Sequence, residues 1–139
     1  MKEKALHLLG LMRRANAIAV GEVNTGSAAR GGKAKLLLLA EDASPNARDR
    51  AEGFAAGRGV ALVEMPFTTE DLAAAGGVSG GSMAAVTDLG LANALLRLLA
   101  DEAPERYGAA AGHIEQRWGE ARNALQTRKK RIGKRRTNG

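Results

Sequence analysis

The sequence contains no cysteine among its 139 residues, which excludes disulfide bonds and metal sites built from thiolates. Aromatic residues make up only 3% of the chain, so few side chains are available for stacking against bases. The unbroken apolar stretches are far shorter than the roughly 20 residues that a membrane-spanning helix needs. These absences predict a soluble, cytoplasmic protein without a membrane partner.

The length and the 45% hydrophobic content suit a single domain with a sizeable core. The composition changes after Ala100, where acidic residues and Pro104 mark a boundary. We therefore expect a compact domain over residues 1–100, an acidic boundary followed by an amphipathic helix over 101–127, and a basic, disordered tail over 128–139.

The net charge of +6 is concentrated near the C-terminal end. Residues 128–136, RKKRIGKRR, include seven basic side chains and no acid, and the remainder has 14 basic and 15 acidic residues. The body is therefore nearly neutral, and the tail is suited to phosphate contacts that weaken as salt increases. A solubilising role is the alternative. The predicted phosphate contacts of the tail are Arg128, Lys129, Lys130, Arg131, Lys134, Arg135 and Arg136.

Helical and extended patterns alternate along the first 100 residues. Strands are predicted at residues 17–20, 35–40, 61–65 and 83–86, with helices before, between and after them. The run KLLLLA at 35–40 shows no alternation of polar and apolar residues, as expected of a strand covered on both faces, so we predict it to be the central strand. The order of elements favours an α/β fold with a central mixed, mostly parallel sheet between helices.

Two of the predicted helices begin with recognisable capping residues. Ser44 followed by Pro45 is typical of an N-cap with proline at the first helical position. Thr68 and Asp71 have the spacing of a capping box for the helix after the third strand.

A second apolar stripe follows the acidic boundary. Ile114, Trp118, Ala121 and Leu125 recur at helical spacing, which predicts an amphipathic helix. The stripe can dock either onto the body or onto a partner.

The acidic and histidine residues do not form an evident active site. Glu41 and Asp42 follow the central strand, but neighbours at a strand end point to opposite faces, so they are poorly placed as a catalytic pair. We expect them instead to favour the N-terminus of the following helix. His7 and His113 are isolated and fit no local metal-binding spacing. We therefore predict no metal, no cofactor and no enzymatic activity.

The glycine-rich stretch GGVSGGS, residues 76–82, does not predict a nucleotide site. Phosphate-binding loops run from a strand through the glycines into a helix, whereas this loop runs from a helix into a strand. No small-molecule substrate is expected here.

Four motifs, in order, are similar to those of the kink-turn-binding ribosomal protein family of the L-seven-Ae and L-thirty-e type, and most similar to its bacterial, ribosome-associated branch. The resemblance covers residues 4–99 and implies a three-layer α-β-α sandwich, in agreement with the alternation above. The four motifs are LHLLGLMRRANAIAVGEV, ARGGKAKLLLLAEDASPN, MPFTTEDLAAAGGVS and AAVTDLGLANALL.

The resemblance also implies that RNA binds at the N-terminal end of the second helix and two nearby loops. The matching positions, with Glu22 beside them, are Gly21, Val23, Asn24, Ser27, Ser44, Gly77, Val78, Ser79 and Gly80. Kink-turn binders of this family typically carry an Asn-Glu pair and a lysine at the positions of Val23, Asn24 and Ser27. Asn24 can still hydrogen-bond to RNA and Gly26 can permit close backbone approach, but Val23 and Ser27 supply neither the amide nor the cation.

Basic residues at the end of the second helix add candidate phosphate contacts. Arg30, Lys33 and Lys35 lie close together in the sequence and can contact the RNA backbone, although a solvated rim is the alternative. Base stacking on a sheet surface is not expected, since the aromatic residues lie elsewhere. The recognition that remains is of backbone and shape.

These observations together predict a non-enzymatic, ribosome-associated protein that binds bent, kink-turn-like RNA with help from its tail. Its expected partners are structured RNA, in particular ribosomal RNA, and ribosomal proteins. The alternative is a protein-interaction adaptor on the same scaffold that has lost specific RNA readout.

Overall fold

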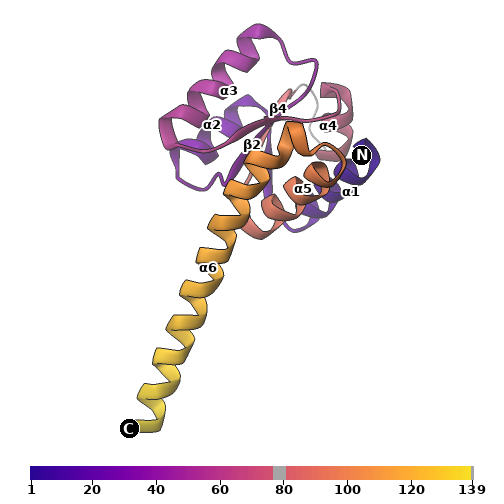
Figure 1. Cartoon of the computed structure of the whole chain (residues 1–139). Helices are drawn as coiled ribbons and strands as arrows, with labels where there is room; N and C mark the ends of the chain where they lie inside the picture. The colour runs from indigo at the N-terminus through magenta and orange to yellow at the C-terminus, as the bar shows by residue number, and fades with distance from the viewer. Residues whose placement is uncertain (77–80, 139) are drawn as a thin grey trace.

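The computed structural model of the chain describes residues 1–76 and 81–138, with side chains described up to residue 130. It shows a mixed α/β body from which one long helix projects (Figure 1). The helices are α1 (Lys2–Arg14), α2 (Glu22–Arg30), α3 (Pro45–Arg58), α4 (Thr69–Gly76), α5 (Leu89–Glu102) and α6 (Pro104–Asn138). The strands are β1 (Ile18–Val20), β2 (Leu36–Leu39), β3 (Leu62–Glu64) and β4 (Met83–Val86), and each lies within a predicted segment.

The strands form one mixed sheet in the order β1-β4-β2-β3. β2 and β3 are parallel, but β4 is antiparallel to both β1 and β2. The prediction of a mixed sheet is therefore confirmed, whereas the prediction that it is mostly parallel is wrong. The N–H of Gly21, after β1, donates to Met83 O, and the N–H of Ala40, after β2, donates to Ser82 O. β4 therefore starts at the end of the sheet where β1 and β2 end, so it is antiparallel to both. The apolar run in β2 indicated that this strand is buried on both faces. Such burial occurs for either strand direction, so it did not predict how β4 is oriented.

Helices cover both faces of the sheet (Figure 1). Leu36 and Leu38 of β2 pack in the cluster that includes α1, α5 and α6, whereas Leu37 packs with Ala28 of α2 and Ala55 of α3. Successive residues of a strand point to opposite faces, so β2 contributes to both helical layers. The three-layer α-β-α sandwich and the central position of β2 are confirmed.

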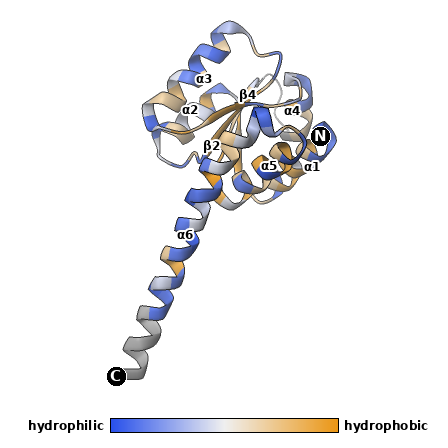
Figure 2. Ribbon diagram, in the orientation of Figure 1, coloured by the Kyte–Doolittle hydropathy of each residue, from blue (hydrophilic) through white to orange (hydrophobic). Residues whose placement is uncertain are grey.

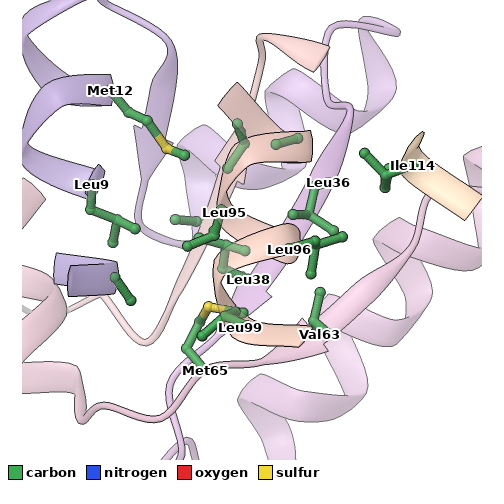
Figure 3. Close-up of a cluster of buried hydrophobic side chains, with 14 of the residues drawn as sticks. Leu9, Met12, Leu36, Leu38, Val63, Met65, Leu95, Leu96, Leu99 and Ile114 are labelled. Atoms are coloured by element: carbon green, nitrogen blue, oxygen red, sulfur yellow. The ribbon is translucent and has the colours of Figure 1, made fainter. Parts of the chain in front are cut away.

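The largest cluster of buried hydrophobic side chains lies between the sheet and helices α1 and α5 (Figure 3). Leu9 of α1 and Leu95 of α5 are fully buried there, and Ile114 of α6 completes the same cluster. Burial of a side chain of this size stabilises a fold by about 1.5–3 kcal/mol. The first part of α6 is therefore part of the body and not an appendage.

The predicted helix caps are confirmed. The Ser44 Oγ accepts a hydrogen bond from the Ala47 N–H at 3.1 Å, with Pro45 at the first helical position of α3. At α4, the Thr68 N–H donates to Asp71 Oδ2 at 3.0 Å, and the Asp71 N–H donates to Thr68 Oγ1 at 3.2 Å. This reciprocal pair is the capping box read from the sequence.

Asp42 stabilises a different helix from the one predicted. Its carboxylate accepts hydrogen bonds from the Thr69 N–H at 2.8 Å and the Thr69 Oγ1 at 2.9 Å, at the start of α4 and not of α3. The cause is the parallel pairing of β2 and β3, which places the residues after both strands at the same end of the sheet. The bond from the Thr69 backbone N–H holds the pKa of Asp42 below its ordinary value of 3.8.

Helix α6 is attached to the body by polar and apolar contacts. The buried Tyr107 donates its hydroxyl hydrogen to Glu64 O at 2.8 Å, and burial raises the pKa of this phenol. Arg106 Nη2 lies 2.8 Å from Glu64 Oε2. Further along, the Trp118 ring packs so closely on Gly90 that a Cβ there would lie 3.0 Å from Cη2.

Beyond Trp118, helix α6 extends away from the body as a polar rod (Figures 1 and 2). Residues 120–130 are all exposed, including Leu125 at 53%. The apolar stripe thus docks onto the body only through its first half. Where a disordered tail was predicted from Arg128, the helix continues to Asn138. Residues 120–132 contain no glycine or proline and are rich in arginine and lysine, which favour helix.

Replacing Asp42 with Asn should lower the melting temperature near neutral pH and have little effect near pH 2. Because the folded-state pKa of Asp42 is depressed, its stabilisation is present above pH 3.8 and is lost as pH falls through the folded-state value. Ser44→Ala removes a cap that does not titrate, so its destabilisation should persist at both pH values. Equal destabilisation by Asp42→Asn at both would contradict this assignment.

Candidate nucleic-acid interface

Three helices begin at the same end of the sheet. The hydrogen bonds of Gly21 and Ala40 place the starts of α2 and α3 beside the start of β4, and the Glu41 N–H donates to Phe67 O just before α4. Helix N-termini present unpaired N–H groups and a partial positive charge. This end of the sheet is therefore suited to receive an anion.

Of these three N-termini, only that of α2 lacks a side-chain cap in the described structure. Its N-cap is Gly21, which has φ +100 and no side chain to offer. The N–H groups of Glu22, Val23 and Asn24 consequently have no side-chain acceptor among the described residues. An external acceptor such as a phosphate oxygen can take their place.

The start of α2 lies in contact with Gly81, two residues before β4. A Cβ added to Gly81 would lie 2.9 Å from Gly21 Cα and 3.1 Å from Gly21 N, so only glycine fits there. The predicted site residues Gly77, Val78, Ser79 and Gly80 lie outside the described residues. The chain that follows them nevertheless reaches the α2 N-terminus.

Three of the predicted residues share a groove along α2 and the edge strand β1. Asn24, Ser27 and Lys33 line this groove, which has a volume of about 530 Å³, together with Asn16 and Thr87. Sequence reasoning missed Asn16 and Thr87. Asn16 has φ +55 just after α1, a backbone conformation that asparagine tolerates better than most residues, and its position after a predicted helix was the available signal.

The side chains at the α2 N-terminus differ in what they can offer a ligand. Glu22 forms an ion pair with Arg50 at 2.8 Å, which offsets a charge that would otherwise repel phosphate. Val23 is 80% exposed and presents an apolar surface. Asn24 donates from Nδ2 to Val20 O at 3.0 Å, which leaves its Oδ1 as an acceptor for a donor such as a base amino group.

Other predicted residues are occupied by contacts within the protein. The Arg30 guanidinium lies 5.9 Å from the centroid of the Phe54 ring on α3. The expectation that Gly26 permits close approach of RNA is wrong, because Gly26 is buried and a Cβ there would meet Phe54 Cζ at 2.8 Å. Its small size serves the packing of α2 against α3. Ser44 is exposed, with its Oγ engaged in capping α3.

The basic part of α6 lies at the other end of the body from the α2 N-terminus. His113 and Arg117 of α6 line a pocket with Gly32, just after α2, and Lys35, whose N–H bonds to Val86 O at the far end of β4. The exposed tail residues Arg128, Lys129 and Lys130 project further from this end. Arg131, Lys134, Arg135 and Arg136 also lie on α6, but their side chains are outside the described part.

Among the described residues, no three His, Cys, Asp or Glu side chains gather as metal ligands would. In the same part of the chain, no helix has the length and apolar character needed to cross a bilayer.

Gly81→Ala should displace the α2 N-terminus from the start of β4. The added methyl meets backbone, which cannot move aside as a side chain can, so we expect a loss of about 1–3 kcal/mol in the free energy of unfolding. Gly57→Ala is the control, because a Cβ there meets open space within a helix and should stabilise by about 0.5–1 kcal/mol. Urea unfolding of both variants measures these free energies. If Gly81→Ala were as stable as Gly57→Ala, the contact between Gly81 and Gly21 would be contradicted.

Comparisons with known proteins identify the family of the body. Residues 3–96 match the ribosomal protein L7Ae/L30e/S12e/Gadd45 family. A protein of unknown function from Bacillus halodurans C is 25% identical with a TM-score of 0.62, over 68% of this chain and 95% of that one. The Giardia lamblia 15.5kD RNA binding protein is 23% identical with a TM-score of 0.54, over 69% of this chain and 82% of that one.

A search of curated proteins finds no significant match. The family match includes all four strands and ends within α5, so α6 lies outside it. The two solved structures support the same fold for the body. The chain therefore belongs to the ribosomal protein L7Ae/L30e/S12e/Gadd45 family.

Proposed function

We propose that the protein is a non-enzymatic RNA-binding protein whose α2 N-terminus contacts a folded RNA. The observation that carries this proposal is the uncapped start of α2, held against Gly81 at the end of the sheet. Membership of a ribosomal protein family supports RNA as the ligand, as does the fold shared with the Giardia lamblia 15.5kD RNA binding protein.

The contact we propose uses neutral donors in place of cations. The N–H groups of Glu22 and Val23 donate hydrogen bonds to a phosphate oxygen, aided by the partial positive charge of the helix end. Asn24 offers its Oδ1 to a base amino group, and Ser27 and Lys33 extend the contact along the groove. Neutral N–H donors carry no formal charge that neutralises a phosphate, so this surface contributes more to orientation than to affinity.

We propose that the RNA is bent, as in a kink-turn, and belongs to the ribosome. Gly77, Val78, Ser79 and Gly80 would then receive an extruded base. With few cations on this surface, recognition depends on the shape of the RNA backbone more than on base identity. Ribosomal proteins are the further partners we propose.

The projecting half of α6 supplies the affinity that the neutral surface lacks. Arg122, Arg128, Lys129 and Lys130 are exposed on it, and the helix presents them at fixed spacing. Each phosphate neutralised by such a residue contributes about 0.7–0.9 to the slope of log affinity against log salt. The expected result is strong, salt-sensitive binding with modest specificity of its own.

The second candidate is a protein-interaction adaptor built on the same fold. It is favoured by Val23, an apolar side chain that is 80% exposed where kink-turn binders carry a polar pair. In that case the α2 N-terminus would contact a protein surface, and RNA would bind only through α6.

Titration with a kink-turn RNA and a straight duplex, at two salt concentrations, separates the two candidates. Val23→Glu places a second acid at the α2 N-terminus, where it favours the helix but repels phosphate, so kink-turn binding should weaken about tenfold. Leu11→Glu is the matched control, since Leu11 is also an exposed apolar residue but lies on α1.

The combined variant Arg128→Gln, Lys129→Gln, Lys130→Gln should behave differently. Its affinity for both RNAs should fall, and the slope of log affinity against log salt should become shallower by about 2–3. The preference for the kink-turn should persist. If this variant abolishes all binding and Val23→Glu changes nothing, the tail alone binds RNA and the adaptor is the better account.

A further inference from the structure

A basic pocket lies at the end of α2 opposite to the proposed interface. Its volume is about 380 Å³, and it is formed where α6 crosses the ends of α2 and α3. Lys35 and Arg58 line it from the body, and His113 and Arg117 line it from α6. No acidic side chain is among its described lining residues.

The charges of this pocket have no counter-ion within the described structure. None of the ion pairs between described side chains includes Lys35, Arg58, His113 or Arg117. Cations brought together without an acid raise the local potential and favour a bound anion. The C-terminal ends of α2 and α3 each carry about half a negative charge, which weakens this positive potential. Together these two partial charges are smaller than the summed formal charge of Lys35, Arg58 and Arg117.

One of these cations is already positioned. Arg58 Nη2 donates to Arg30 O at the end of α2, which fixes the guanidinium while its remaining N–H groups stay available. Arginine presents its donors in a planar fork that matches the oxygens of a phosphate. The imidazole of His113 carries at least one N–H donor in either protonation state.

Two glycines leave the pocket open to a ligand. Gly32 and Gly59 follow α2 and α3, with φ +72 and +63, and no atom lies within 4 Å of a Cβ built at either position. Both belong to the pocket lining. A phosphate can therefore approach the backbone there without meeting a side chain.

We propose that this pocket binds a phosphate group and that the bound phosphate joins α6 to the body. Arg58 and Lys35 would contact it from one side, and Arg117 and His113 from the other. The proposal goes beyond the proposed function, since it requires neither a kink-turn nor the α2 N-terminus. The phosphate can come from an RNA backbone or from a free phosphorylated molecule.

An RNA source is geometrically consistent with the rest of the molecule. Helix α2 has nine residues, so its two ends are about 14 Å apart. The pocket also lies at the base of the projecting basic helix, because His113 and Arg117 precede the exposed residues 120–130 on α6. An RNA that contacts the α2 N-terminus can therefore pass the pocket on its way to α6.

Titration of the full chain with inorganic phosphate at constant ionic strength, followed by NMR, tests the pocket. We expect saturable shifts of the Gly32 and Gly59 amides and of the His113 ring. Lys35→Gln combined with Arg117→Gln should raise the phosphate Kd about tenfold or more, since two charge-assisted contacts are lost and the Arg58 bond to Arg30 is kept. The control with equal charge loss is Lys4→Gln combined with Arg97→Gln, in a separate groove between α1 and α5.

RNA titration of the same variants identifies the source of the phosphate. A larger loss of RNA affinity in the pocket variant than in the control assigns the pocket to the RNA backbone. Unchanged RNA affinity with lost phosphate binding assigns it to a free phosphorylated molecule. The pocket proposal is overturned if the full chain shows no saturable shifts or if Lys35→Gln with Arg117→Gln binds phosphate as tightly. Val23→Glu should leave phosphate binding unchanged, so the two proposals can fail separately.

Discussion

The backbone contact between Gly21 and Gly81 determines the arrangement of the candidate interface. Gly21 donates its N–H to Met83 O at 2.9 Å, and the absence of a side chain on Gly81 lets the two segments touch. β4 is an inner strand, hydrogen-bonded to both β1 and β2, so this contact fixes the start of α2 to the interior of the sheet. Donors held in place before binding lose little conformational freedom when a ligand arrives.

In the proposed function, shape recognition and electrostatic affinity belong to different parts of the molecule. The neutral body offers N–H groups and the groove of Asn24 and Ser27, whereas α6 carries exposed cations away from it. The pocket of Arg58 and Arg117 lies where these two parts meet. Since Tyr107 and other α6 residues are buried in the core, the direction of the cationic rod is set by the same packing that stabilises the fold.

Local signals in the sequence predicted local structure well and long-range arrangement less well. The caps at Ser44 and Thr68 were correctly read because each depends on residues three positions away. The direction of β4 and the capping of α4 by Asp42 depend on which strands become neighbours, and no short pattern reports that. In the site, Asn24 was predicted from the family resemblance, whereas Asn16 joins it only through the packing of β1 beside α2. The bacterial branch of the family stays a prediction.

The most direct test of the account is to map the RNA contact on the full chain by NMR. Amide shifts would be followed as a kink-turn RNA is added at a salt concentration that weakens the contribution of α6. The account predicts the largest changes at Glu22, Val23 and Asn24 and at Gly81, because the uncapped α2 N-terminus meets the RNA there. Changes confined to α6, with residues 21–24 unaffected, would contradict it.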